Sequence, residues 1–263
     1  MAAVVDTGSQ ADDLLRAGDF DGARRVLVEV VKADPGHVPT RLFLWQLLAV
    51  QGDWAKAKTH LAALAQLSPE AQMLSVVYGQ AIDAEATRAA VMAGRERAII
   101  HGGSDWADGV AEALQLAATG AAEQADDVRA AAFDDAPNTP GTLDGVAVDW
   151  IADADPRFGP VIEAIIGGRY GLLPFDAVAK ITSEGPKDLR DIVWYPVELT
   201  LKAGPRIAAL LPARYPDLSA DPAELAAKAT GWRDDGHGVG QRLWTASDGE
   251  DRGLLSVRSV ELG

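Results

Sequence analysis

The sequence predicts an α+β protein of two domains. We expect a helical domain over residues 1–136, followed over residues 137–263 by a domain of short, mostly antiparallel strands with a few short helices. Residues 107–136 contain 12 alanines, which favours helix, whereas 10 of the 14 prolines lie between Pro137 and Pro216 and favour turns. The apolar residues change from helical spacing to strand-like alternation at the same place.

A repeat of 34 residues organises the first half. Gly18-Asp19-Phe20 reappears as Gly52-Asp53-Trp54, and Asp34-Pro35 reappears as Ser68-Pro69. This is the period of a tetratricopeptide-type helical hairpin, in which a glycine ends one helix and lets the chain turn into the next. Gly120 lies two periods beyond Gly52 and predicts a third hairpin, although the frame has no glycine between them. We therefore expect a tetratricopeptide-like α-α superhelix.

Apolar spacing and turn residues together set the bounds of the expected helices. Ser68-Pro69 stops one helix and starts another, because serine is a good N-cap and proline is tolerated in the first turn. Gly94 is a natural end for a long helix. The expected helices are residues 9–17, 22–33, 38–50, 54–66, 70–93, 105–119 and 122–135.

The pattern of the second half predicts short strands that form a curved sheet or partial barrel. Val197–Lys202 alternates between apolar and polar residues, and Gly167-Gly168 predicts a hairpin turn. Short helices are expected at Lys187–Ile192 and Pro222–Ala229. The other expected strands are Pro160–Ile166, Arg169–Leu173, Val178–Ser183, Arg206–Leu211, Gln241–Ala246 and Gly253–Glu261.

The composition disfavours several classes of function. The formal net charge is −15, and acidic residues outnumber basic ones in both halves. Nucleic acids and anionic membranes are therefore poor partners, because both are bound through clustered Lys and Arg. The chain has no cysteine, its N-terminus lacks the pattern of an export signal, and no apolar run is long enough to span a bilayer. We expect a cytoplasmic protein without membrane insertion.

One acidic segment could carry chemistry. Asp144, Asp149, Asp153 and Asp155 place four carboxylates within 12 residues, so a metal-dependent hydrolase is one interpretation. Their spacing lacks the ligand pattern of a calcium loop, and turn capping with pairing to Arg157 is the better explanation. The histidines are scattered, and the chain has neither a nucleophile elbow nor a phosphate-binding loop. We expect no metal, no cofactor and no catalytic residues.

Several short motifs across nearly the whole chain resemble the ImpE/TagJ family, which comprises accessory proteins of the bacterial type VI secretion system. The stretch from Pro140 to Trp194 is the most specific. The motifs are Leu15–Asp19, Phe43–Leu48, Gly52–Trp54, Pro140–Gly145, Trp150–Asp155, Gly167–Tyr170, Asp188–Trp194 and Gly240–Arg242.

This resemblance implies a function and partners. Family members are non-enzymatic, contact the N-terminal helix of the small subunit of the contractile sheath, and are linked to the ClpV unfoldase that recycles contracted sheath. The stretch Gly171-Leu172-Leu173-Pro174 after Arg169-Tyr170 departs from the family pattern, because relatives tend to carry a further aromatic residue there. The alternative is a generic tetratricopeptide-type co-chaperone that binds peptides.

Two groups of residues are candidates for contact with partners. Arg41, Trp45 and Gln46 lie on the first helix of the second hairpin, the helix that lines the concave side in such repeats. In the repeat frame Trp45 occupies a position where small residues are usual, so it either widens the packing or faces outward. The second group matches the family's C-terminal signature and forms either a structural ionic network, which we favour, or a docking site: Trp150, Asp153, Asp155, Arg157, Arg169, Tyr170, Arg190, Asp191 and Trp194.

Overall fold

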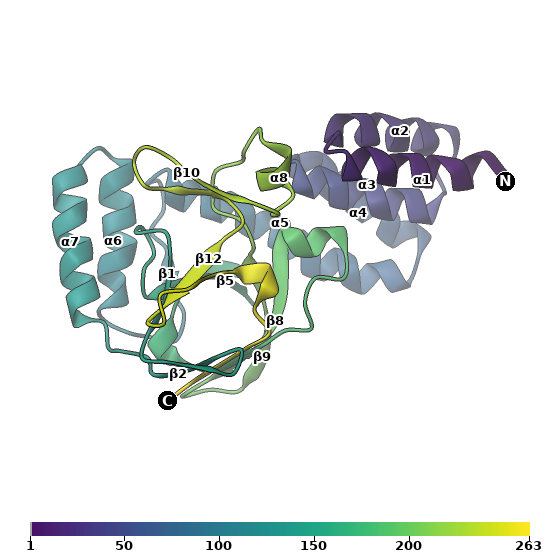
Figure 1. The fold of residues 1–263 in the computed structure, drawn as a ribbon. Helices are drawn as coiled ribbons and strands as arrows, with labels where there is room; N and C mark the ends of the chain where they lie inside the picture. The colour runs from purple at the N-terminus through teal and green to yellow at the C-terminus, as the bar shows by residue number, and fades with distance from the viewer. Residues whose placement is uncertain (1) are drawn as a thin grey trace.

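A computed structural model describes the backbone of residues 2–263 and the side chains from residue 8 onward. Paired helices at the N-terminal end lead through one long helix to a second helix pair beside a curved sheet (Figure 1). The helices are α1 (Ala2–Arg16), α2 (Phe20–Ala33), α3 (Val38–Val50), α4 (Trp54–Leu67), α5 (Glu70–Met92), α6 (Ala107–Ala118), α7 (Ala122–Asp135) and α8 (Pro222–Leu225).

The repeated glycines end helices, as the 34-residue period predicts. Gly18, Gly52 and Gly120 all have positive φ, between 71° and 89°, a conformation that glycine adopts without steric cost. The following residues Asp19 and Asp53 cap the next helix, each accepting a hydrogen bond from the backbone N–H three residues on. The tetratricopeptide-like part and the α6–α7 hairpin are thereby confirmed.

Nine strands form the main sheet in the order β1-β6-β5-β9-β8-β7-β14-β2-β3. Neighbouring strands in this sheet are antiparallel, except that β1 is parallel to β6. Two smaller sheets, β10-β11 and β13-β12-β4, lie beside it. The strands are β1 (Ile99–Ile100), β2 (Gly141–Leu143), β3 (Val146–Val148), β4 (Ile151–Asp153), β5 (Val161–Ile166), β6 (Arg169–Pro174), β7 (Val178–Thr182), β8 (Trp194–Leu201), β9 (Arg206–Pro212), β10 (Thr230–Trp232), β11 (Gly238–Gly240), β12 (Leu243–Ala246), β13 (Asp251–Gly253) and β14 (Ser259–Leu262).

The expected strands and the Gly167-Gly168 hairpin are present, with three corrections to the details. The helix expected at Lys187–Ile192 is the 3-10 turn η2 (Leu189–Ile192), and α8 is shorter than expected. The strand expected over Gly253–Glu261 is interrupted by the 3-10 turn η3 (Leu254–Ser256), which leaves β14 as its second part. The sequence reading also missed seven very short strands, because two or three residues have too little periodicity to detect. They are β1, β2, β3, β4, β10, β11 and β13.

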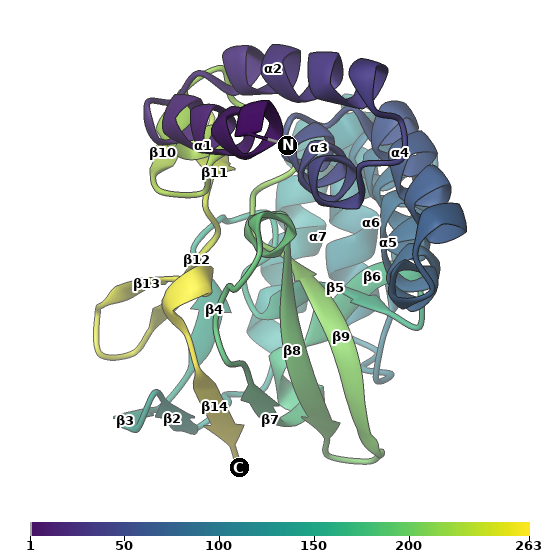
Figure 2. The ribbon, with the colours of Figure 1, turned by 90° about the vertical axis from the view of Figure 1, so that its right-hand side faces the viewer.

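Two apolar cores stabilise the molecule, and the first is shared by both halves of the chain. It joins the helices to residues of the sheet such as Tyr170, Leu172 and Trp194, while the second lies within the strand-rich half around Trp244. The helical pairs lie over one end of β8 and β9 (Figure 2). Secondary structure changes type between Asp135 and Gly141, near the predicted boundary. The division into domains 1–136 and 137–263 stays a prediction.

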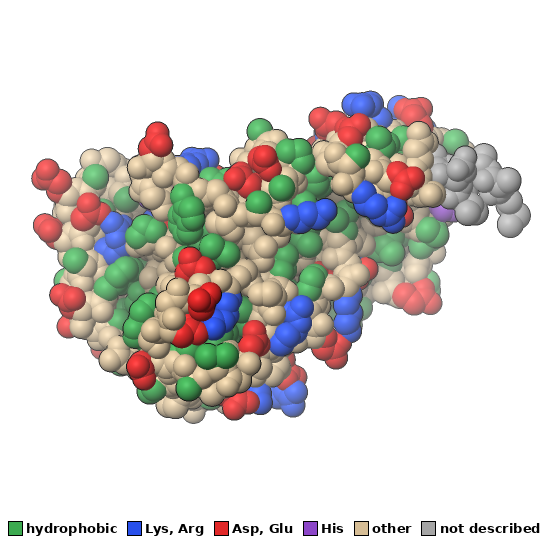
Figure 3. Space-filling view, viewed as in Figure 1, with side chains coloured by type: hydrophobic (Ala, Val, Ile, Leu, Met, Phe, Trp, Pro, Cys, Tyr) green, Lys and Arg blue, Asp and Glu red, His purple; other side chains and the backbone are tan. Residues whose placement is uncertain are grey.

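The described surface carries both signs of charge. On the face in Figure 3, acidic and basic side chains are interspersed and no broad basic area is present. None of the helices over residues 2–263 combines the length and apolar character that crossing a bilayer requires.

Candidate functional site

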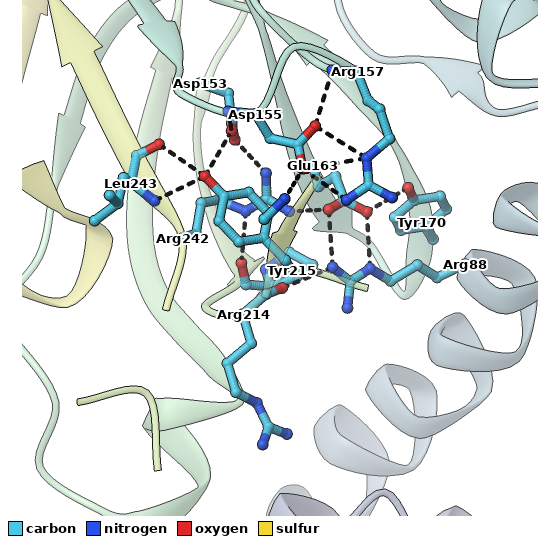
Figure 4. Close-up of polar contacts among 12 residues, drawn as sticks. Arg88, Asp153, Asp155, Arg157, Glu163, Tyr170, Arg214, Tyr215, Arg242 and Leu243 are labelled. Carbon is cyan, nitrogen blue, oxygen red and sulfur yellow. Dashed lines mark hydrogen bonds and ion pairs between the residues drawn. The ribbon is translucent and has the colours of Figure 1, made fainter. Parts of the chain in front are cut away.

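A buried ionic network lies where α5 meets the sheet (Figure 4). α5 supplies Arg88, β5 supplies Glu163, β4 supplies Asp153, and Arg242 directly precedes β12. All four side chains are at least nine-tenths buried. Charges survive such burial only when they are paired and hydrogen-bonded, so the geometry of the network decides its stability.

Glu163 is the centre of the network because two arginines and a tyrosine bind it. Arg88 donates from Nε to Oε1 at 2.8 Å and from Nη2 to Oε2 at 2.9 Å, and Arg242 also contacts Oε2. The Tyr170 hydroxyl donates to Oε1 at 2.6 Å. Burial alone raises the pKa of Glu163, but the two guanidinium charges and these hydrogen bonds outweigh it and bring the pKa to about 2.

Arg242 connects Glu163 to Asp153. Its guanidinium carbon lies 4.8 Å from the ring centres of both Phe158 and Tyr215, a cation–π arrangement between two aromatic side chains. Asp153 accepts hydrogen bonds from Arg242 and, at 3.1 Å, from the Tyr215 hydroxyl. Burial nevertheless raises the pKa of the Asp153 carboxyl to about 6.

Asp155 connects the loop after β4 to the small β10-β11 sheet. Arg157 pairs with it at 2.6 Å, and the backbone N–H groups of Arg157 and Gly238 donate to it at 2.9 and 2.8 Å. The structural network that the sequence favoured for Asp153, Asp155 and Arg157 is therefore present in the structure.

A second cluster holds the η2 turn against the helical pairs. Asp191 accepts from the backbone N–H groups of Lys187 and Asp188, and Arg190 lies 4.9 Å from the ring centre of Tyr78. Trp194 donates its indole N–H to Glu85 of α5 at 2.9 Å. Its ring packs against both Tyr78 and Trp54.

The structure corrects the nomination of Trp45 and Gln46 as surface contacts. Trp45 is 0% exposed and packs against Tyr78, while the buried Gln46 accepts a hydrogen bond from the backbone N–H of Arg190 at 3.0 Å. The physical reason is that η2 covers this end of α3, so the concave face is not free there. Arg41 is partly exposed, and its contact with a partner stays a prediction.

Two of the signature residues lie outside both the buried network and the second cluster. Trp150 is exposed directly before β4, and Arg169 is exposed at the start of β6. Tyr170, the neighbour of Arg169, points to the opposite face of the sheet and reaches Glu163. The signature thus combines buried structural residues with surface residues.

Sequence reasoning missed several members of the network, although two signals were available. Glu163 lies in the apolar run Val161–Ile166, where a carboxylate must find a partner. Glu85 and Arg88 are charged residues of an alanine-rich helix, three positions apart and therefore on one face. The missed residues are Glu85, Arg88, Glu163, Arg214, Tyr215 and Arg242.

The four carboxylates of the hydrolase interpretation do not form one site. Asp153 and Asp155 are engaged by arginines, and Asp144 accepts from the backbone N–H groups of Arg258 and Ser259. Asp149 is exposed. Among the described side chains, no three acidic or histidine residues are grouped so as to hold a metal ion. The arrangement is suited to joining α5 to the sheet.

The fold and its buried network define a tetratricopeptide-like protein with a strand-rich C-terminal half. Residues 14–77 match the tetratricopeptide repeat model, and residues 145–261 match the model of the ImpE protein family. The chain is 44% identical over 254 residues to a Pseudomonas aeruginosa protein named type VI secretion system accessory component TagJ. The alignment covers 95% of this chain and 90% of the relative. The chain therefore belongs to the ImpE/TagJ family of type VI secretion accessory proteins.

A solved structure has the same fold. The crystal structure of protein VPA1032 from Vibrio parahaemolyticus superimposes with a TM-score of 0.87, at 19% identity and with 97% of each chain covered. At that identity the likeness concerns the fold alone.

Proposed function

We propose that this chain is a non-enzymatic adaptor of a type VI secretion system. In this proposal its helical half binds the N-terminal helix of the small sheath subunit in the cytoplasm, and the complex takes part in ClpV-dependent recycling of the sheath. Family membership and the name of the Pseudomonas relative support the secretion role. The sheath helix and ClpV come from the resemblance described above.

The observation that carries the helix-binding proposal is an exposed apolar surface on α5 and the end of α4. We call it the α5 strip and define it as Leu67, Met73, Val76 and Val77. Met73 is 70% exposed and Val76 57% exposed, although both are large apolar side chains. Contiguous apolar side chains on a monomer's surface are typical of interaction sites.

The α5 strip has the geometry to receive a helix. Met73, Val76 and Val77 are spaced i, i+3 and i+4, so they lie along one face of α5. Nearby Gly79 has open space beside it, because a Cβ added there would meet no atom within 4 Å. An amphipathic helix whose apolar residues have the same spacing would bury the strip in the helix-in-groove manner.

Calorimetric titration with a peptide that matches the N-terminal helix of the cognate small sheath subunit tests this proposal, with a scrambled peptide as the first control. We expect saturable binding of the native peptide only. Val76→Asp should weaken it at least tenfold, because a carboxylate on the strip would be buried without a partner.

Val146→Asp is the matched control variant. Val146 is 46% exposed, is also apolar, and lies on β3 rather than on α5. The same substitution there should leave the peptide affinity unchanged. Equal binding of native and scrambled peptides, or an equal effect of both substitutions, would remove the α5 strip as the binding surface.

A further inference from the structure

A cavity of about 330 Å³ lies between the C-terminal part of α5 and the segment after β9. Its volume is at the lower end of the range of small-ligand sites. It is separate from the α5 strip along the helix, because it begins at Glu85 rather than at Met73. The cavity is lined by Trp54, Glu85, Arg88, Ala89, Met92, Ala93, Val193, Arg214, Tyr215, Pro216, Asp217 and Leu218.

Arg214 is the unusual member of this lining. Its side chain is buried, and Nη1 donates to the carbonyl oxygens of Val50 and Leu225, the last residues of α3 and α8, at 2.9 and 2.7 Å. Among the side chains described from residue 8 onward, no carboxylate forms an ion pair with Arg214. Burial of the charge lowers the pKa of Arg214 to about 10.

The unused part of the Arg214 guanidinium has a defined geometry. The two Nη1 hydrogen bonds to Val50 and Leu225 leave Nε and Nη2 without an acceptor in the described part of the chain. The N–H groups along this edge are parallel and match the two oxygens of a carboxylate. Glu85 is not the missing partner, because its oxygens already face the indole of Trp194 at 2.9 Å and Arg88 at 3.4 Å.

The rest of the cavity restricts what the ligand can be. Trp54, Met92, Val193 and Pro216 form apolar walls, and Leu218 is 50% exposed. These walls favour an apolar group next to the charge. Glu85 and Asp217 also line the cavity, and their negative charge disfavours a doubly charged phosphate over a singly charged carboxylate.

We propose that this cavity binds a carboxylate attached to a small apolar group, held by the Nε–Nη2 edge of Arg214. The carboxylate could belong to a free small acid or to the C-terminus of a peptide, since both present the same chemistry. This site is independent of sheath binding, so either proposal can fail without the other.

An NMR titration of the full-length protein tests the inference through the Nε–H resonance of Arg214, assigned by its loss in Arg214→Lys. The probes are 4-methylpentanoate for a free acid and N-acetylleucine for a peptide C-terminus, and their amides are the uncharged controls. We expect at least one acid to shift the resonance saturably, with at least tenfold tighter binding than its amide. Preference for N-acetylleucine identifies a peptide terminus as the source, and preference for 4-methylpentanoate a free acid.

A pair of variants on the exposed Ala89 tests the cavity without altering Arg214. Ala89→Glu adds a competing carboxylate to the lining and should weaken binding of the acid at least tenfold, whereas Ala89→Gln adds the same bulk without charge and should weaken it much less. Both replacements are good helix formers on α5, so both proteins should fold. Equal affinity for acids and amides, no saturable shift with either acid, or an unchanged affinity in Ala89→Glu would overturn the proposal.

Discussion

Glu163 is stable inside the protein because its burial is compensated by three donor side chains. Arg88 binds both of its oxygens, Arg242 shares one of them, and Tyr170 donates to the other. Removing one member of such a group leaves the others buried without a partner, which costs more than the net value of any single bond. The network is therefore sensitive to single substitutions.

Glu163→Gln should lower the free energy of unfolding by about 3–5 kcal/mol, because it leaves Arg88 and Arg242 buried with less compensating charge. Denaturant unfolding followed by far-UV circular dichroism measures this change. The control is Glu261→Gln, since Glu261 pairs with Lys180 on the surface, where such a change costs about 0–1 kcal/mol. Equal effects of the two substitutions would contradict the role of the buried network.

Stability should depend on pH through Glu163 and Asp153 with opposite signs. The pKa of Glu163 is depressed from 4.5 to about 2, so its contribution is present above pH 4.5 and is lost as the pH falls from 4.5 to 2. This contribution is about 3 kcal/mol. The pKa of Asp153 is raised from 3.8 to about 6, so its ionised form is unfavourable at pH 7 and that cost disappears as the pH falls towards 3.8. The free energy of unfolding should therefore be greatest near pH 4–5.

Unfolding curves measured from pH 2 to pH 8 test these signs by comparison of variants. Glu163→Gln should lose less stability than the wild type between pH 4.5 and 2. Asp153→Asn should lack the part of the wild-type gain that occurs between pH 7 and 5. Identical pH profiles for the wild type and both variants would show that other groups control acid unfolding.

At the scale of elements, local signals explain why the helices could be predicted so closely. A cap, a turn glycine and an apolar spacing occur within a few residues of each helix end, as at Asp53 and Gly52. β1 has no comparable signal, because its two residues become a strand only by pairing with β6. The burial of Trp45 was unpredictable for the same reason: Tyr78 and η2, which cover it, are distant in the sequence.

The same distinction between local and distant partners applies to the candidate site. Asp155 and Arg157 are two residues apart, so their ion pair could be proposed from the sequence. Arg88 and Glu163 are 75 residues apart, and only the packing of α5 against β6, which pairs with β5, brings them together. A single sequence can indicate that Arg88 and Glu163 each need a charged partner, but it does not identify that partner.

Alanine substitutions at two glycines with positive φ allow the cost of backbone strain to be measured apart from the cost of overpacking. Gly120 has open space around it, whereas a Cβ on Gly159 would lie 2.4 Å from the ring of Phe133 on α7. Gly120→Ala should cost about 1 kcal/mol from the backbone alone. Gly159→Ala should cost about 1–3 kcal/mol more, because the ring must move in a packed interface. Thermal unfolding of both variants measures the difference, and equal losses would show that α7 yields to the added methyl group.

On the scale of the whole molecule, the two halves are joined by polar and apolar contacts together. Arg88 and Glu85 of α5 bind Glu163 and Trp194 of the sheet, and the first apolar core includes residues from both halves. β1 extends the sheet with residues that precede α6. An interface with its own buried charges and a continuous apolar core resembles the interior of one domain more than a contact between two.

The fragment of residues 137–263 should therefore not fold by itself. It lacks Arg88, so Glu163 would lose its principal partner, and it lacks β1, so the edge of β6 would be unpaired. The fragment of residues 70–263 restores α5, β1, α6 and α7 and is the matched control, for which we expect a dispersed amide NMR spectrum and a cooperative denaturant transition. The shorter fragment should show neither. If it instead unfolds cooperatively with a dispersed spectrum, the division after residue 136 separates two independent domains, and the buried network is an interface between them rather than part of a single folding unit.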